Sequence, residues 1–174
     1  SYSPIEHVNS RIKSPQSIIS KLNREEHSLT MGNIVKYVND VAGVRIICAF
    51  STDIFIIARM LASQKDIKVL KVKDYVTNPK ANGYRSYHMI ISVPVFLAER
   101  EVDTKVEIQI RTMAMDFWAS LEHKIKYKFK GESPNSLRRE LKECADISDF
   151  LDRKMLSINS ELQDYQDYQK ESAK

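Results

Sequence analysis

The most informative segment of the 174-residue chain is Val106-Glu107-Ile108-Gln109-Ile110-Arg111. In an extended strand this alternation puts three aliphatic side chains on one face and a carboxylate, an amide and a guanidinium on the other. A solvated strand face more commonly carries lysine, threonine and serine without order. We therefore interpret Glu107, Gln109 and Arg111 as candidate site residues on a half-buried strand, and an ordinary outward polar face is the alternative.

The elements around this segment predict a mixed β-sheet flanked by helices. Apolar patterns and turn residues favour strands over 44–50, 67–75, 84–96 and 104–112. Helices are expected to start at Ser14-Pro15 and to cover 30–39, 51–64 and 112–129, the last with a core side made by Phe117, Trp118, Leu121 and Ile125. Gly43 is expected to let the chain turn sharply into the strand at 44. Strands and helices interleaved in this way are typical of an α/β domain.

A last long helix is predicted from Ser133-Pro134 onward. Steps of three and four residues, the spacing of a packed seam in a bundle or coiled coil, separate its apolar or small residues Leu137, Leu141, Cys144, Ser148, Leu151, Met155, Ile158 and Leu162. We divide the chain into a core domain over 1–131 and a C-terminal helical extension over 132–174. The extension either covers its own domain or forms an oligomer interface.

The charge distribution indicates a polyanionic ligand. The chain has 27 Lys and Arg against 23 Asp and Glu, a net charge of +4. Basic residues gather in three segments, 11–24, 71–85 and 124–139, which suit RNA and nucleoside triphosphates equally. No apolar run approaches the length of a membrane span, and no signal-peptide pattern opens the chain. We therefore expect a cytoplasmic protein without membrane contact.

A second polar segment is Asp40-Val41-Ala42-Gly43-Val44-Arg45, at the start of a predicted strand. An aspartate just before a glycine is commonly no more than a turn residue. Magnesium, however, is usually held by one or two carboxylates together with substrate phosphate oxygens. Asp40 and Glu107 are the two carboxylates that neighbouring strands could bring together, and they are our candidate ligands for Mg²⁺.

A third segment is Asn78-Pro79-Lys80-Ala81-Asn82-Gly83-Tyr84-Arg85-Ser86-Tyr87-His88, a loop that continues into a strand. Tyr84 and His88 share one face of that strand. A tyrosine at the mouth of a loop can stack on a base, while Lys80, Arg85 and His88 can meet phosphates. The alternative is a tyrosine packed on the sheet edge beside a surface lysine.

These three segments, with Ala114-Met115-Asp116-Phe117-Trp118-Ala119-Ser120-Leu121-Glu122-His123-Lys124 after them, resemble the RelA/SpoT-type synthetase domain. They closely resemble its single-domain branch, the small alarmone synthetases. The chain has no Gly-rich phosphate loop of the Walker or Rossmann kind, which fits a family that grips triphosphates with side chains. The resemblance implies a nucleotidyltransferase-like GTP/GDP diphosphokinase. Such an enzyme transfers the β,γ-pyrophosphate of ATP to the 3′-hydroxyl of GTP or GDP, releases AMP, and makes the stringent-response alarmone (p)ppGpp.

The same resemblance implies roles for individual residues. Asp40 and Glu107 would hold Mg²⁺, and Glu107 would also orient or deprotonate the 3′-hydroxyl, with Gln109 and His88 as weaker candidates for that task. The contacts to ATP would be Arg11 and Arg45 on adenine, and Lys13, Ser17, Lys21 and Arg24 on the phosphates. The contacts to GTP or GDP would be Tyr84 on guanine, and Lys80, Arg85, His88 and Arg111 along the ribose and phosphates.

Asp116 carries a separate hypothesis. Guanine presents its N1–H and its amino group as paired donors, and one carboxylate can accept both. We hypothesise that Asp116 distinguishes guanine from adenine in the acceptor site. The alternative is an exposed acid in the first turn of a helix, favoured by the helix dipole.

Further expectations concern the whole protein. Multidomain family members carry an alarmone hydrolase, for which the chain leaves no room, so we expect synthesis without hydrolysis. Resemblance to the small members implies a homo-oligomer, a tetramer formed through terminal helices. Three other functions remain open: a nucleotide- or RNA-binding module without turnover, a nucleotidyltransferase that releases pyrophosphate instead of AMP, and a structural oligomeriser that rests on the C-terminal seam alone.

Overall fold

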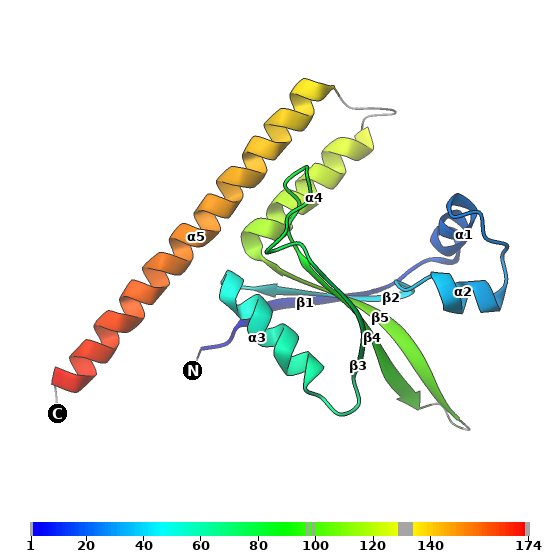
Figure 1. Ribbon diagram of the computed structural model, residues 1–174, viewed down its shortest axis with the longest axis horizontal. Coiled ribbons are helices and arrows are strands. Elements are labelled where there is room, and N and C mark those ends of the chain that lie inside the picture. Colours follow the sequence, from blue (N-terminus) through cyan, green and yellow to red (C-terminus); the bar gives the residue numbers. More distant parts are fainter. Residues whose placement is uncertain (1, 97, 99, 129–133, 173–174) are drawn as a thin grey trace.

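The computed structural model describes residues 2–96, 98, 100–128 and 134–172. At its centre is a five-stranded sheet in the order β1-β2-β5-β4-β3 (Figure 1). The strands are β1 (Ile5–Ile12), β2 (Ala42–Cys48), β3 (Lys68–Asp74), β4 (Tyr87–Phe96) and β5 (Glu101–Thr112). Since β2 and β5 run parallel while the other neighbours are antiparallel, the expected mixed sheet is confirmed.

Helices flank the sheet, as expected for the α/β class. They are α1 (Pro15–Arg24), α2 (Met31–Tyr37), α3 (Ser51–Ala62), α4 (Met113–Lys128) and the long α5 (Asn135–Ser172). In Figure 1, α1 and α2 lie at one end of the sheet, and α4 and α5 at the other. The sequence signal for α1 is confirmed in detail: the Ser14 hydroxyl accepts a hydrogen bond from the Ser17 amide at 3.3 Å, and Pro15 opens the helix.

The main core lies between α3 and one face of the sheet. Cys48, Met89 and Ile110, from the three central strands, are almost fully buried there, together with Ile54 of α3. Because side chains alternate along a strand, the residues between them point to the opposite face. That opposite face carries the polar side chains that the sequence marks as candidates.

The sequence pattern does not predict β1. Its apolar residues Ile5, Val8 and Ile12 recur in steps of three and four, and all eight of its residues are exposed. Backbone pairing with β2 holds the strand, from Ile5 opposite Cys48 to Ile12 opposite Ala42. An edge strand with two exposed faces has no reason to alternate in sequence, so only the tertiary pairing defines it.

Two local expectations are wrong. Gly43 lies inside β2 without a positive φ, so the sharp turn expected there does not form. On α4, Phe117 is 65% exposed and Leu121 is 41% exposed, although both were expected to face the core. Trp118 is buried as expected, and Met115, which the prediction did not include, is buried on the same helix, which packs against α5 and β5.

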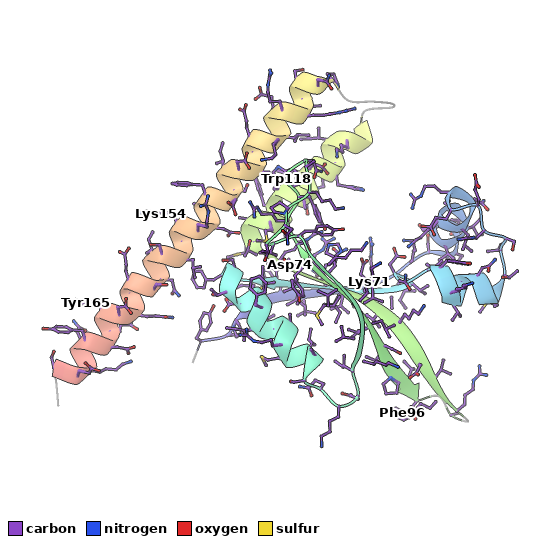
Figure 2. The ribbon with its side chains drawn as sticks, viewed as in Figure 1. Lys71, Asp74, Phe96, Trp118, Lys154 and Tyr165 are labelled. Carbon is purple, nitrogen blue, oxygen red and sulfur yellow. The ribbon has the colours of Figure 1, made fainter. Side chains whose placement is uncertain are left out.

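The first half of α5 packs along α4. Trp118, labelled in Figure 2, donates from Nε1 to the Leu141 carbonyl at 2.8 Å, and Ala145 is buried beside it. Most of the predicted seam is not buried against other parts of the chain. Five of its members are exposed: Cys144, Leu151, Met155, Ile158 and Leu162. The last turns, around Tyr165, extend beyond the sheet (Figure 2). The predicted boundary at 131/132 falls outside the described residues.

None of the described helices, α5 included, is both long enough and apolar enough to cross a membrane.

Candidate active site

Strand register brings the predicted site residues together on the polar face of the sheet. In the parallel pair β2–β5, Gly43 lies opposite Glu107 and Arg45 lies opposite Gln109. In the antiparallel pair β4–β5, His88 lies opposite Gln109. Side chains at paired positions point to the same face, so Arg45, Glu107, Gln109 and His88 form one continuous polar surface.

Two cavities open on this surface. The first, which we call the Arg11 cavity, has a volume of about 270 Å³ and is lined by Asn9, Ser10, Arg11, Gly43, Val44, Arg45, Glu107 and Gln109. The second, the Asp40 cavity, has a volume of about 160 Å³ and is lined by Lys21, Asn39, Asp40, Lys71, Lys73, His88, Ile90 and Glu107. Glu107 lines both cavities and therefore stands between them.

Asp40 is held by two cations. Lys13 and Lys21 both donate to its carboxylate, with Lys21 Nζ at 2.7 Å from Oδ1. Burial acts to raise the pKa of Asp40, but the two lysine hydrogen bonds and charges outweigh burial and hold the pKa below its ordinary value of 3.8. The carboxylate is therefore ionised at neutral pH and available as an oxygen ligand or as a phosphate-site anchor for the two lysines.

Glu107 is also ionised at neutral pH. His88 Nδ1 lies 3.5 Å from one carboxylate oxygen, and Gln109 Nε2 donates to the other at 3.5 Å. The hydrogen bond with His88 lowers the pKa of Glu107 and outweighs burial, which raises it; the charge of Asp40 raises it further and that of Arg11 lowers it. The ionised carboxylate is in the form that can accept a proton, and its contacts with His88 and Gln109 orient it.

The two acids fit a magnesium site that is completed by substrate. Asp40 and Glu107 line the same cavity, and their charges influence each other. Among the described residues no group of three or more His, Cys, Asp or Glu side chains could hold a metal ion. Two carboxylates are nevertheless the usual protein share of a Mg²⁺ site whose other ligands are phosphate oxygens and water. In this structure both carboxylate oxygens of Asp40 accept hydrogen bonds from Lys13 and Lys21. A bound metal ion would replace a lysine at one of these oxygens.

Beside the Asp40 cavity lies an aromatic cluster built around Tyr84. The Tyr84 hydroxyl accepts from Arg111 Nη2 at 2.6 Å and shares a hydrogen bond with His88 Nε2 at 2.9 Å. Lys80 Nζ lies 4.9 Å from the centre of the Tyr84 ring and 4.8 Å from that of Tyr75. The cluster combines a ring for stacking with cations for phosphate, the combination that the loop sequence indicates.

Asp116 bridges two arginines. Arg111 Nη1 donates to its Oδ1 at 3.0 Å, and Arg45 Nη1 lies 3.3 Å from the same oxygen. Asp116 thereby connects the Arg11 cavity, which Arg45 lines, to the Tyr84 cluster, which Arg111 joins. Recognition of guanine by Asp116 would have to use its second oxygen or displace one guanidinium.

Three predicted ligand residues line neither cavity and take no part in the contacts of Asp40, Tyr84 or Asp116. Ser17 is exposed on the first turn of α1, where its hydroxyl lies 2.9 Å from that of Ser14. Arg24 is exposed on the last turn of the same helix. Arg85 is turned toward α5, where its Nε lies 3.3 Å from Asp149 Oδ1, and it is not brought together with Tyr84 and His88.

Lys71 and Lys73 line the Asp40 cavity, although the sequence marks them only as part of a basic segment. Both lie on β3, where Lys73 pairs with His88 and Lys71 with Ile90. Their alternation on one strand was a usable signal, but assigning it needs the pairing of β3 with β4. They bring two further positive charges to the cavity that holds both acids.

The model of a known protein family matches most of the chain. Residues 10–132, more than half of the chain, match the model described as the region found in RelA/SpoT proteins. The chain is 51% identical over 161 residues to GTP pyrophosphokinase YwaC of Bacillus subtilis. The aligned region covers 92% of this chain and 77% of that protein. It is 39% identical over 165 residues to GTP pyrophosphokinase YjbM of the same organism, over 95% of this chain and 77% of that protein.

Solved structures give the same relationship. The crystal structure of small alarmone synthetase 1 from Bacillus subtilis bound to its product pppGpp superposes with a TM-score of 0.85 at 39% identity, over 94% of this chain and 82% of that one. The structure of small alarmone synthetase 2 from the same organism superposes with a TM-score of 0.85 at 51% identity, over 92% of this chain and 83% of that one. The match extends over the sheet, the flanking helices and α5, so the predicted fold is confirmed. The chain belongs to the RelA/SpoT family, in the branch of the small alarmone synthetases.

Proposed function

We propose that this protein is a GTP/GDP diphosphokinase that transfers the β,γ-pyrophosphate of ATP to the 3′-hydroxyl of GTP or GDP and releases AMP. Its relatives are named GTP pyrophosphokinases, and one of the similar structures holds pppGpp. The observation that carries the proposal is the place of Glu107, which lines both cavities and faces Asp40 across one of them. Two polyphosphate substrates need such a meeting point.

ATP is assigned to the Arg11 cavity and the adjoining basic helix. Arg11 and Arg45 line that cavity, and guanidinium planes stack well on an adenine ring. Lys13 and Lys21 lie beside Asp40, at the side of the cavities from which the phosphates would reach Glu107. These cations, with Lys71 and Lys73, offset the repulsion between donor and acceptor phosphates.

The guanosine substrate is assigned to the Tyr84 cluster. Guanine stacks on Tyr84, and Lys80, His88 and Arg111 lie where they can meet the ribose and the 5′-phosphates. This places the 3′-hydroxyl near Glu107, since His88 contacts both Tyr84 and Glu107. Asp116 is kept as a candidate for guanine recognition.

The reaction then needs one proton acceptor and close alignment. Glu107 takes the proton of the 3′-hydroxyl, and Gln109 and His88 hold the Glu107 carboxylate in place. The 3′-oxygen forms a bond to the β-phosphorus of ATP as the bond from that phosphorus to the α,β-bridging oxygen breaks. AMP leaves with the bridging oxygen, and the β- and γ-phosphates remain on the 3′-oxygen. Phosphoryl transfer of this kind depends mainly on positioning and charge neutralisation.

Mg²⁺, held by Asp40 and Glu107 with the ATP phosphates, would supply charge neutralisation at the transferred group. We also propose a homo-oligomer, a tetramer in the form expected from the family resemblance, with α5 as part of its interface. Because ATP and GTP are the substrates, we expect the protein to act in the cytoplasm. Direct binding measurements with RNA would test whether RNA is an additional ligand of the basic surface.

The test is incubation with ATP, GTP and Mg²⁺, with the nucleotides resolved by chromatography. We expect equal amounts of AMP and a 3′-pyrophosphorylated guanosine nucleotide. Release of pyrophosphate without AMP would instead support the nucleotidyltransferase alternative, and tight nucleotide binding without any product would support the binding-module alternative. Incubation of ppGpp with a divalent metal should release no pyrophosphate, and its release would contradict synthesis without hydrolysis.

A further inference from the structure

The loop that carries the guanosine-site residues, residues 75–86, is organised by its own hydrogen bonds. The Asp74 carboxylate, labelled in Figure 2 at the end of β3, accepts from the amides of Val76 and Thr77 at 2.9 Å each. Farther along, the Lys80 amide donates to the Tyr84 carbonyl at 3.1 Å, and the Gly83 amide donates to Lys80 at 2.8 Å. These bonds define the shape of the loop but do not fix its place on the sheet.

Arg111 of β5 ties the loop to the sheet through Tyr84 and Ser86, and contacts with α4 and α5 hold it from the helical side. Asn82 Nδ2 donates to Glu122 of α4 at 3.1 Å. Gly83, with a φ of 88°, lies so close to α5 that an added Cβ would stand 2.4 Å from the Ala145 side chain. Arg85 reaches Asp149 one turn farther along α5. The loop is therefore held by two helices, and Tyr84 itself packs against the cluster that Trp118 and Ala119 of α4 form with Ala145 of α5.

The Arg85–Asp149 pair has the geometry of an anchor. Its side chains are only 23% and 18% exposed, so water screens the pair less than it would a surface pair. Arg85 Nη1 also donates to the Val76 carbonyl at 3.0 Å, which joins both ends of the loop to one side chain. Asp149 also forms an ion pair with Arg153 of the same helix, whose Nε lies 3.2 Å from its Oδ2.

We propose that Asp149 is a positioning residue for the guanosine substrate, acting through Arg85 to hold the loop that presents Tyr84 and Lys80. The proposal rests on the function given above and makes α5 part of the acceptor site without touching substrate. The proposed ATP contacts come from β1, α1 and β2, whereas the anchor joins the loop to α5. Loss of Asp149 therefore affects the two substrates differently.

The test compares Asp149→Asn with the same substitution at Asp167. Asp167 lies on the same helix and forms an exposed ion pair with Lys170, far from the loop. For Asp149→Asn we expect the KM for GTP to rise about 10-fold or more, with the KM for ATP and the Tm close to those of the parent and of Asp167→Asn. Asp149→Glu, which keeps the charge, should recover part of the loss.

Two outcomes would overturn the proposal. If Arg85 itself binds the phosphates of GTP, removal of its partner leaves the KM for GTP unchanged or lowers it. If Asp149 only stabilises the fold, the KM values for ATP and GTP rise together and the Tm falls. Should Asp149→Asn fail to fold, Arg85→Gln replaces it, with the same rise in the KM for GTP expected and the same two contrary results.

A second measurement does not depend on activity. Hydrogen–deuterium exchange at the amides of residues 76–84 should be faster in Asp149→Asn than in Asp167→Asn, with exchange in β4 and β5 unchanged. If the parent protein made no (p)ppGpp, the proposed function would fail, but this comparison would still test the anchor. Equal exchange in the two variants would rule the anchor out.

Discussion

Glu107 is the residue on which the chemistry depends most directly. We expect Glu107→Gln to lower kcat by about 100-fold or more, because the amide cannot accept the proton of the 3′-hydroxyl. Steady-state kinetics with ATP and GTP measures the loss, and calorimetry should find both nucleotides still bound. A variant with unchanged kcat would remove Glu107 from the reaction, and a protein whose nucleotide binding alone changed would be a binding module.

His88 is predicted to set the acidic limit of activity. Its hydrogen bond with Glu107 is the largest influence on the carboxyl pKa, which lies below its ordinary value of 4.5. Since a base works only above its pKa, the lowered value extends activity toward acidic pH. In His88→Asn we expect the acidic limb of the kcat/KM profile to move to higher pH. A limb that stays in place in this variant would show that another group controls it.

The lowered carboxyl pKa values also make the stability of the folded protein depend on pH. A carboxyl group with a lowered pKa stabilises the folded protein above its unfolded pKa, and this stabilisation is lost as pH falls through the folded pKa. Asp40 and Glu107 both belong to this class. The polar face of the sheet is therefore expected to contribute to stability at neutral pH and to lose that contribution in acid.

Asp116 is tested by the choice of acceptor. If its free oxygen accepts from the guanine amino group, inosine triphosphate, which lacks that group, should be a poorer acceptor than GTP by about 10-fold or more. Asp116→Ala should reduce this preference, although it also releases Arg45 and Arg111. Equal use of ITP and GTP by the unmodified enzyme would end the hypothesis and leave Asp116 as the bridge between two arginines.

At the scale of elements, the contact between α5 and the sheet contains an unfavourable charge. Burial raises the pKa of Asp152, and the nearby charge of Asp149 raises it further, against the opposing effects of Thr112 and Arg85. The ionised group therefore costs stability, and this cost grows as pH rises above the ordinary value of 3.8. Asp152→Asn should raise Tm by about 2–4 °C at neutral pH.

Melting curves over a pH series check this prediction. The gain from Asp152→Asn should shrink in acid, where the carboxyl group is protonated in the parent protein. Asp152→Ala is the matched control, because it also removes the acceptor for the Thr112 hydroxyl and should lower Tm. A lower Tm for both variants at neutral pH would mean that the ionised carboxylate is favourable in the fold.

The elements themselves were predictable to different degrees. β2 and β5 bury one face each, and their alternation or apolar runs are visible in sequence. β1 has no buried face and gives no such pattern. On α5 the side beside the loop carries Ser148, a member of the expected seam, together with Ala145 and Asp149, which the seam pattern leaves out. A helix that packs against a loop needs small side chains that let the two backbones come close, more than it needs large apolar side chains.

For the whole molecule, the exposed apolar side of α5 is the feature that a single chain does not explain. Ile147 and Phe150 are 67% and 64% exposed, and Leu151, Met155 and Ile158 continue the same stripe. A contiguous stripe of this kind is typical of an interface. We expect Phe150→Glu to lower the molar mass measured by light scattering, while Ser160→Glu, at an exposed polar position, leaves it unchanged.

An unchanged mass for Phe150→Glu would contradict the role of α5 in assembly. Removal of the whole helix is a poorer test, because α5 also contacts the loop at Gly83 and Arg85. A truncated chain would lose loop placement together with any interface. Point changes on the exposed side separate the two roles of this helix.

The sequence predicts which kinds of side chain the candidate site contains, but not which of these side chains contact one another. Glu107 and His88 come from short motifs, and the register of β4 and β5 brings them to one face, whereas Asp40 and Tyr84 lie just before β2 and β4. The pairing of Arg85 with Asp149 joins residues far apart in sequence, which no local pattern encodes. Local sequence specifies the chemistry available, whereas long-range packing decides which side chains remain free for substrate.

The fate of each ATP phosphorus tests the central claim most directly. With ATP labelled separately at the α- and γ-phosphates and an excess of GTP, one turnover should leave all α-label in AMP and all γ-label in the terminal phosphate of the new 3′-pyrophosphate group. The same transfer should be lost in Asp40→Asn and in Glu107→Gln, because both acids line the cavity where the substrates meet. Label from the α-phosphate on the acceptor, or γ-label transferred equally well by both variants, would contradict the account.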